Sequence, residues 1–370
     1  MYRNRILSTA IALAIVLTLA LPALADGSSA VAWLKSQQNA DGGFGTPEST
    51  VGATADVLLA VAATGDTAMD WNQGENTPYS YLEANAESIV GTGDMGKVVL
   101  ALVASGTNPR NLGVVDLINK LEGSLGSDGQ YGTSGMINDQ AYAMIALGSA
   151  KRPVPNEAVS YLLDRQIADG TWSWNGDTTA GTGDNNTAAM AVLALIAAGV
   201  PADNEQIQKT LAHFAGQQNE DGGFPYIKPS AYGTDSDSNS TAVVMWAILA
   251  AGQDPAGSAW KYEGQDGHSA LDKLRAFQND SGAYRWQDAF PDDNFMSTVQ
   301  AAIAQELKAL PFAWMDVGDV GITAIEAPAG EPETLPQTGA NLWIAAIAML
   351  SGGAALVGLG LLQNRWSKHP

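Results

Sequence analysis

At residues 31–45 the chain reads VAWLKSQQNADGGFG, and at residues 211–226 it reads LAHFAGQQNEDGGFPY. Both stretches contain the phrase Q-Q-N-x-D-G-G-F. Partial copies follow the same order of an apolar run, then Asp-Gly or Ser-Gly, then an aromatic residue: LGSDGQYG at 125–132, LLDRQIADGTWSW at 162–174 and LRAFQNDSGAYRW at 274–286. Internal self-similarity of this kind is typical of repeat architectures, so the repeated unit decides the fold.

Each repeated unit predicts a helical hairpin. The Asp-Gly pair supplies the positive φ of a tight turn after a first helix. A second run rich in Ala and Leu favours helix and ends at a glycine suited to a helix C-terminus. Five such glycines punctuate the chain: Gly65, Gly106, Gly148, Gly199 and Gly252. A sixth apolar run, STVQAAIAQELKAL, has no glycine at its end.

Six hairpins predict an all-α fold over residues 26–310, with twelve helices in an α6/α6 toroid. The second helix of each hairpin is apolar around most of its circumference, which suits burial in an inner ring. We expect the inner helices at 54–65, 96–106, 139–148, 186–199, 241–252 and 297–308. The first helices carry charged residues and form the outer ring. The aromatic residues Phe44, Tyr131, Trp172, Phe224 and Tyr284 are expected to pack between neighbouring units.

The phrase Q-x-x-D-G-(G/x)-(F/W/Y) resembles the repeat of the prenyltransferase and squalene-cyclase superfamily, whose fold is the α/α toroid. The resemblance covers roughly residues 28–310. Fold alone does not imply function. Because the chain has no cysteine, it lacks the zinc ligands of the protein prenyltransferases and the thioester residue of the complement-type members. No strand-rich segment follows residue 310, so the additional β domain of the cobalamin carriers is missing.

The class II terpene cyclases of this superfamily carry an acid motif, Asp-x-Asp-Asp-Thr-Ala, at the start of an inner helix. The nearest text is DSDSNSTA at 235–242. Alignment on Thr-Ala places Asp237 first and Asn239 where the proton-donating acid should stand. An amide cannot donate that proton as a carboxylic acid does. The resemblance therefore implies the fold of a cyclase without its acid.

The first 25 residues have the pattern of a secretory signal peptide. Arg3 and Arg5 precede an apolar stretch, and a small-x-small site predicts cleavage between Ala25 and Asp26. A signal peptide at 1–25 predicts an exported, extracellular protein.

The end of the chain has the pattern of a sorting signal at 335–370. The pentapeptide LPQTG (Leu335, Pro336, Gln337, Thr338, Gly339) precedes an uncharged run at 342–362 and a basic tail, QNRWSKHP. The run has 21 residues, enough to cross a membrane as a helix. This order resembles the signal read by sortases, which implies cleavage after Thr338 and attachment to the cell wall at the cell surface. A permanent single-pass membrane anchor is the alternative. The Pro- and Glu-rich stretch 311–334 predicts a disordered spacer.

The charge of the chain agrees with an exported surface domain. It carries 39 Asp and Glu residues against 18 Lys and Arg, a net charge of −21. Such a surface repels nucleic acid, so no nucleic-acid partner is expected. A closed ring of this length can bury a sufficient core without disulfides.

Acidic and amide residues precede the inner helices, where a toroid gathers them at one mouth. They are first of all candidates for helix N-caps. As a set they are also candidate ligand-binding residues: Asp184, Asn186, Asp235, Asp237, Asn239, Asp292 and Asp293. Converging carboxylates could bind calcium, although DSDSNS lacks the glycine and glutamate of a complete EF-hand loop. The same carboxylates could instead serve as paired acids for glycoside cleavage.

Three aromatic residues lie in loops outside the repeat phrase: Trp71, Trp174 and Tyr232. They are candidates to stack on a glycan or a flat small molecule. Two function hypotheses follow. One is an anchored, non-catalytic binding or display module that uses the ring mouth. The other is an exported enzyme of the same fold, either degenerate terpene-cyclase-like or carbohydrate-active.

Overall fold

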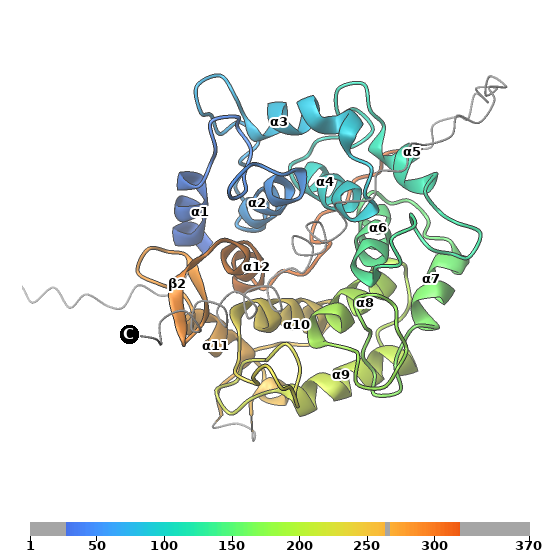
Figure 1. Ribbon diagram of the computed structural model, residues 1–370, viewed down its shortest axis with the longest axis vertical. Helices are drawn as coiled ribbons and strands as arrows, with labels where there is room; N and C mark the ends of the chain where they lie inside the picture. Colours follow the sequence, from blue (N-terminus) through green and yellow to red (C-terminus); the bar gives the residue numbers. More distant parts are fainter. Residues whose placement is uncertain (1–26, 263–266, 319–370) are drawn as a thin grey trace, which may run out of the picture.

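The computed structural model describes residues 27–262 and 267–318. Within them the chain forms twelve α-helices arranged in two concentric rings (Figure 1). The inner ring consists of α2 (Val51–Ala63), α4 (Thr92–Ala104), α6 (Ile137–Ser149), α8 (Asn185–Ala197), α10 (Ser238–Ala250) and α12 (Phe295–Gln305). The outer ring consists of α1 (Gly27–Ser36), α3 (Pro78–Asn85), α5 (Leu117–Glu122), α7 (Asn156–Leu163), α9 (Glu205–Gln217) and α11 (Ala270–Ala276).

The inner ring is closed. Each inner helix packs on the next, and α12 packs back on α2 (Figure 1). The helix α10 buries residues 238–248 without interruption, whereas the outer helix α3 buries only Pro78 and Leu82. Burial on all sides follows from the apolar circumference of the inner helices. The predicted toroid of twelve helices is therefore confirmed, with inner-helix bounds shifted by a few residues.

The repeat phrase closes the ring. In each copy the glycine directly after Asp or Ser adopts positive φ, and a Cβ placed on it would collide with the backbone of the next outer helix or its N-cap. Gly42 lies against Thr77 of the next unit in this way. In the last unit Gly282 lies against Ser29 of α1, so the last unit contacts the first. The repeated aromatics are all at most 1% exposed, as predicted: Phe44, Tyr131, Trp172, Phe224 and Tyr284.

The predicted helix-stop role of one glycine is wrong. Gly65, Gly106, Gly199 and Gly252 have positive φ just beyond their helices, as expected. Gly148 instead lies inside α6, which ends at Ser149, and the positive φ falls on Lys151 (53°). A Cβ on Gly148 would lie 2.6 Å from the carbonyl oxygen of Ala197 in α8. This glycine therefore permits the close approach of two inner helices.

A small hairpin interrupts the helical pattern. Strand β1 (Tyr284–Gln287) pairs antiparallel with β2 (Phe290–Asn294), which the predicted all-α fold did not include. Arg285 pairs with Asp293 across the two strands. The hairpin lies between α11 and α12 on the rim of the ring (Figure 1).

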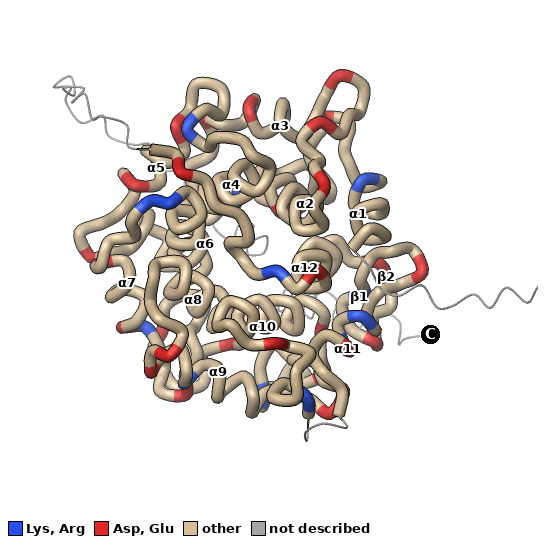
Figure 2. Tube along the Cα trace, turned by 180° about the vertical axis from the view of Figure 1, so that it is seen from behind, with Lys and Arg blue, Asp and Glu red and all other residues tan. Residues whose placement is uncertain are grey.

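The segment 306–318 crosses the central opening after α12, towards α5 (Figures 1 and 2). We call it the strap. Ser149 Oγ donates to the carbonyl of Ala313 (2.8 Å), and Arg110 Nε donates to the carbonyl of Val317 (3.1 Å). The predicted spacer over 311–334 is therefore wrong for 311–318, whose backbone carbonyls are held by ring side chains.

The other terminal predictions lie outside the described residues. These are the signal peptide at 1–25, the rest of the spacer, and the sorting signal at 335–370 with its apolar run at 342–362. No helix within 27–262 and 267–318 is both long enough and apolar enough to cross a membrane.

Candidate functional site

Two of the predicted mouth carboxylates are buried helix caps. Asp184 and Asp237 are 1% and 3% exposed, at the N-caps of α8 and α10. Asp184 accepts from the backbone N–H of Thr187 (2.8 Å), and Asp237 from that of Ser240 (2.7 Å). Burial raises the pKa of Asp184 to about 6 and that of Asp237 to about 7. Both side chains cap their own helix, as the sequence analysis also considered. Asp184 accepts a further hydrogen bond from the Tyr226 hydroxyl.

The remaining predicted carboxylates lie elsewhere on the surface. Asp292 and Asp293 are exposed on β2, and Asp293 Oδ1 accepts from Ser281 Oγ (2.8 Å). Asp235 lines a cleft of about 620 Å³ that also includes Lys228. Nowhere in the described residues do three or more His, Asp or Glu side chains gather in a way that could hold a metal ion. The expected convergence of these carboxylates around calcium is therefore not observed.

The three loop aromatics have different environments. Trp71 is only 9% exposed; its ring centroid lies 6.4 Å from that of Phe44 and 5.3 Å from Lys35 Nζ. Trp71 packs against the repeat phrase. The prediction that its ring is free to stack on a ligand is therefore wrong. Trp174 and Tyr232 are 39% and 80% exposed.

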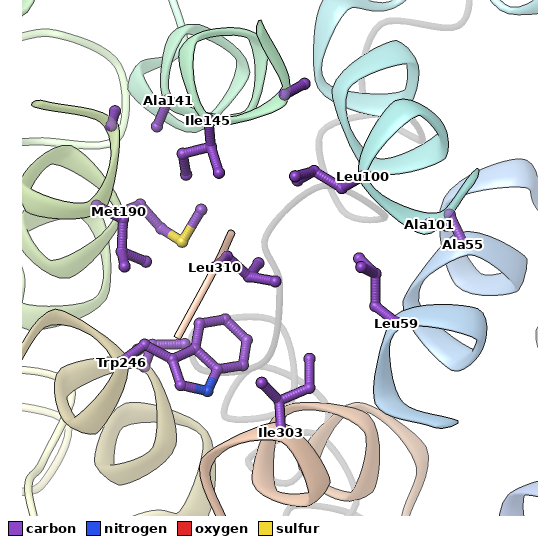
Figure 3. Close-up of a cluster of buried hydrophobic side chains, with 14 of the residues drawn as sticks. Ala55, Leu59, Leu100, Ala101, Ala141, Ile145, Met190, Trp246, Ile303 and Leu310 are labelled. Carbon is purple, nitrogen blue, oxygen red and sulfur yellow. The ribbon is translucent and has the colours of Figure 1, made fainter. Parts of the chain in front are cut away.

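The lumen of the inner ring has an apolar wall. Side chains from all six inner helices point towards the centre of the ring, where Leu310 of the strap lies among them (Figure 3). These side chains are Leu59, Leu100, Ile145, Met190, Trp246 and Ile303, which we call the lumen wall. These side chains are at most 5% exposed, so they form a buried apolar centre of the ring around Leu310.

A polar collar stands one to two turns nearer the N-terminal ends of the inner helices. Residues three, four or seven apart share one face of a helix. Among the polar residues with this spacing to the lumen wall, we call five the collar: Asp56, Lys97, Tyr142, Asn239 and Gln300. Their contacts cross between helices, as expected for side chains that line one opening.

One half of the collar is ionic. Lys97 Nζ lies 2.9 Å from Asp56 Oδ2 and 5.2 Å from the ring centroid of Tyr142. Burial opposes the charge on Lys97, but the Asp56 carboxylate outweighs it and the pKa of Lys97 is raised. Burial raises the pKa of Tyr142 to about 12. Lys97 is thus a charged residue held in place by one carboxylate.

Two further carboxylates flank this ionic half. Burial raises the pKa of Asp94, with Asp56 and Asp139 adding to the effect while Lys97 opposes it. Burial also raises the pKa of Asp139, whose Oδ2 accepts from Ser134 Oγ (2.7 Å). A Cβ on Gly52 would lie 2.7 Å from Asp94 Oδ1, so this glycine makes room for the carboxylate.

The other half of the collar consists of amides. Asn239 Nδ2 donates to Gln300 Oε1 (2.8 Å), and Asn239 Oδ1 accepts from Ser297 Oγ (2.9 Å). Asn186 of the predicted set lies four residues before Met190 and so faces the same opening. Its Oδ1 is buried and has no hydrogen-bond partner among the described residues.

Sequence reasoning found Asn186 and Asn239 but missed Asp56, Lys97, Tyr142 and Gln300. The signal was present, because each of these four interrupts an otherwise apolar inner helix three residues before a lumen-wall residue. The predicted site residues were taken from the segments that precede the helices, whereas these four lie about one turn inside the helices.

Comparisons with known proteins support the fold. The structure is similar to a variant of the type II terpene cyclase MstE from Scytonema in complex with geranylgeranyl dihydroxybenzoate. The TM-score is 0.54 at 15% identity, over 76% of this chain and 95% of that one. It is also similar to the GH76A alpha-1,6-mannanase from Salegentibacter, with TM-score 0.53, 12% identity, and coverage of 77% and 100%. No protein-family model and no curated protein sequence matches the chain.

Proposed function

We propose that this protein is a binding module whose ring lumen takes up an apolar small molecule. The observation that carries the proposal is the lumen wall, to which all six inner helices contribute an apolar side chain (Figure 3). Because these side chains are at most 5% exposed, the ligand would take the place of Leu310 of the strap. Ligand sites combine mostly apolar walls with a few placed polar groups, and the collar supplies those groups at the mouth.

The same wall argues against a glycan as the occupant of the lumen. A sugar needs hydrogen-bond partners for its hydroxyl groups along its length, because an unpaired polar group is costly to bury. Apart from the indole N–H of Trp246, the lumen wall offers only hydrocarbon and thioether groups.

The cyclase acid position supports binding without the cyclase reaction. Asn239 occupies that position and is engaged by Gln300 and Ser297. An exported enzyme of the same fold is the second candidate, favoured by one observation: Asp94 and Asp139 are neighbouring carboxyl groups with raised pKa values. A carboxyl group whose pKa is raised keeps its proton more readily and can act as a general acid.

We also propose that the protein is exported and attached at the cell surface. The predicted signal peptide and LPQTG segment support export and attachment through Thr338, with sortase and the cell wall as partners. If Thr338 is not processed, the run at 342–362 would hold the protein in the membrane as a single span.

The test is untargeted mass spectrometry of molecules extracted from the purified protein. We expect apolar molecules to be retained by the wild type and lost from Ile303→Gln, which places an amide in the lumen wall. Val114→Gln is the matched control, because Val114 is 89% exposed outside the lumen. Circular dichroism confirms that each variant is folded. Retention of sugars alone, or equal retention by Ile303→Gln, would refute the proposal. If the retained molecule is converted to product, and Asp94→Asn prevents the conversion, the enzyme candidate stands instead.

A further inference from the structure

A cleft of about 620 Å³ opens on the rim of the ring, away from the ring centre, and we call it the rim cleft. Three parts of the chain line it: the segment 219–236 between α9 and α10, Tyr262 before α11, and residues 287–289 at the β1–β2 turn. Its volume is within the range of small-molecule sites, about 300–1,000 Å³. The rim cleft is therefore large enough to take a ligand without displacing any part of the described chain.

Side-chain contacts between these parts hold the rim cleft in shape. Lys273 Nζ lies 3.0 Å from Asp221 Oδ2 and 2.7 Å from Asp288 Oδ2, so it joins the repeat phrase at 211–226 to the β1–β2 turn. Asn219 Nδ2 donates to the carbonyl of Thr234 (2.8 Å), which ties the two ends of the segment 219–236 together. A site that is formed before its ligand arrives loses less conformational entropy on binding.

Other polar groups of the rim cleft are left over for a ligand. The carboxylates of Glu220 and Asp235 are exposed, and no hydrogen bond or ion pair joins either of them to another described residue. Lys228 Nζ donates to the carbonyl of Gln218 (2.8 Å) and to Asn219 Oδ1 (3.1 Å). An ammonium group has three N–H donors, so one remains. The rim cleft thus offers both acceptors and a donor to one occupant.

These groups select against a charged occupant. An anion would meet the carboxylates of Glu220 and Asp235, which no described cation neutralises. A cation drawn to those carboxylates would meet the charge of Lys228 and leave its remaining N–H without an acceptor, which is also unfavourable. A hydroxyl group both donates and accepts, so a neutral molecule with several hydroxyl groups matches both kinds of partner. Tyr262 adds an aromatic ring, whose face is apolar.

We propose that the rim cleft binds a short neutral oligosaccharide. Asp235 and Glu220 accept hydrogen bonds from sugar hydroxyl groups, Lys228 donates to a sugar oxygen, and the ring of Tyr262 packs on a C–H face of the sugar. This site is independent of the proposed function, because the rim cleft shares no residue with the lumen wall or the collar. The protein would then bind an apolar molecule at its centre and a polar one at its rim.

The test is titration of the full-length protein with trisaccharides, followed by ligand-observed NMR. The neutral probes are maltotriose, cellotriose, mannotriose and triacetylchitotriose. The charged probes are trigalacturonic acid, an anion, and the glucosamine trimer, a cation. We expect at least one neutral probe to bind, and to bind more tightly than either charged probe. Asp235→Ala or Glu220→Ala should weaken that binding about tenfold, the value of one hydrogen bond to a charged group.

The matched control is Asp292→Ala, which removes the same charge from an exposed carboxylate on β2 outside the rim cleft and should leave sugar binding unchanged. Ile303→Gln should also bind the sugar as the wild type does, and Asp235→Ala should still retain apolar molecules, so the two proposals can fail separately. The inference is overturned if no neutral probe binds, or if neither Asp235→Ala nor Glu220→Ala weakens the binding. Tightest binding of the glucosamine trimer would make the rim cleft a cation site instead, and tightest binding of trigalacturonic acid would refute the charge argument.

Discussion

The buried caps Asp184 and Asp237 should make the protein less stable as the pH rises from 5 to 8. Burial raises the pKa of Asp237 from an ordinary 3.8 to about 7, and that of Asp184 to about 6. Between the unfolded and folded pKa values the folded state holds a proton that the unfolded state has released. The free energy of unfolding therefore falls with pH across this window and levels off above pH 7.

The magnitude follows from the two pKa values. From pH 5 the loss runs for about 2 pH units at Asp237 and about 1 at Asp184, at about 1.36 kcal/mol per unit. Together the two caps cost about 4 kcal/mol of stability by pH 8. Asn caps a helix about as well as Asp and carries no charge. The double variant Asp184→Asn/Asp237→Asn should therefore be close to the wild type at pH 5 and more stable than it at pH 8.

The assay is urea unfolding at half-unit pH steps, with the wild type and the variants measured in parallel. Asp94 and Asp139 also have raised pKa values, so the double variant should keep a shallower slope rather than none. Asp116→Asn, at the partly exposed N-cap of α5, is the matched control and should keep the wild-type slope. Parallel pH profiles for the wild type and the double variant would refute the reasoning.

Three further outcomes are expected. Gly282→Ala should lower the melting temperature far more than Gly65→Ala, because both glycines have positive φ but only Gly282 lies against backbone, that of Ser29; equal shifts in thermal melts would argue against tight closure there. Arg110→Ala should free the end of the strap and speed its cleavage in limited proteolysis, since Arg110 holds the last strap carbonyls; an unchanged cleavage rate would contradict this. Thr338→Ala should move the protein from the wall to the membrane fraction on immunoblots, and continued wall attachment would remove the sorting proposal.

The fold could be predicted from the sequence because the same turn and helix signals recur in each repeat. Five Asp-Gly or Ser-Gly turns and the apolar second helices all predicted one hairpin, and a ring is the arrangement that buries every inner helix. Gly148 misled the sequence analysis because a glycine that ends a helix and a glycine that lets two helices approach look alike in sequence. Only the distance to Ala197 separates them.

The residues of the candidate site were predicted less accurately than the fold. Asp184 and Asp237 are acidic and precede inner helices, but each caps the helix that follows it, through Thr187 or Ser240 three residues further on. A single sequence gives no distances between loops, so convergence could not be tested. The ion pair between Lys97 and Asp56 joins two helices 41 positions apart, a pairing that becomes visible once the ring fixes which helices are neighbours.

The contact between Gly282 and Ser29 bears on how the chain is made. A linear array of hairpins can fold one unit at a time as it leaves the ribosome, since each unit packs only against its neighbours. Here α1 and α2 emerge first, yet their partner α12 is synthesised last, so the side of α2 that meets α12 stays uncovered until almost the whole domain has been made. Apolar surface exposed for that long invites aggregation. Folding of the ring is thus a late event, completed by its last hairpin, and a truncated chain lacking α12 should depend on chaperones.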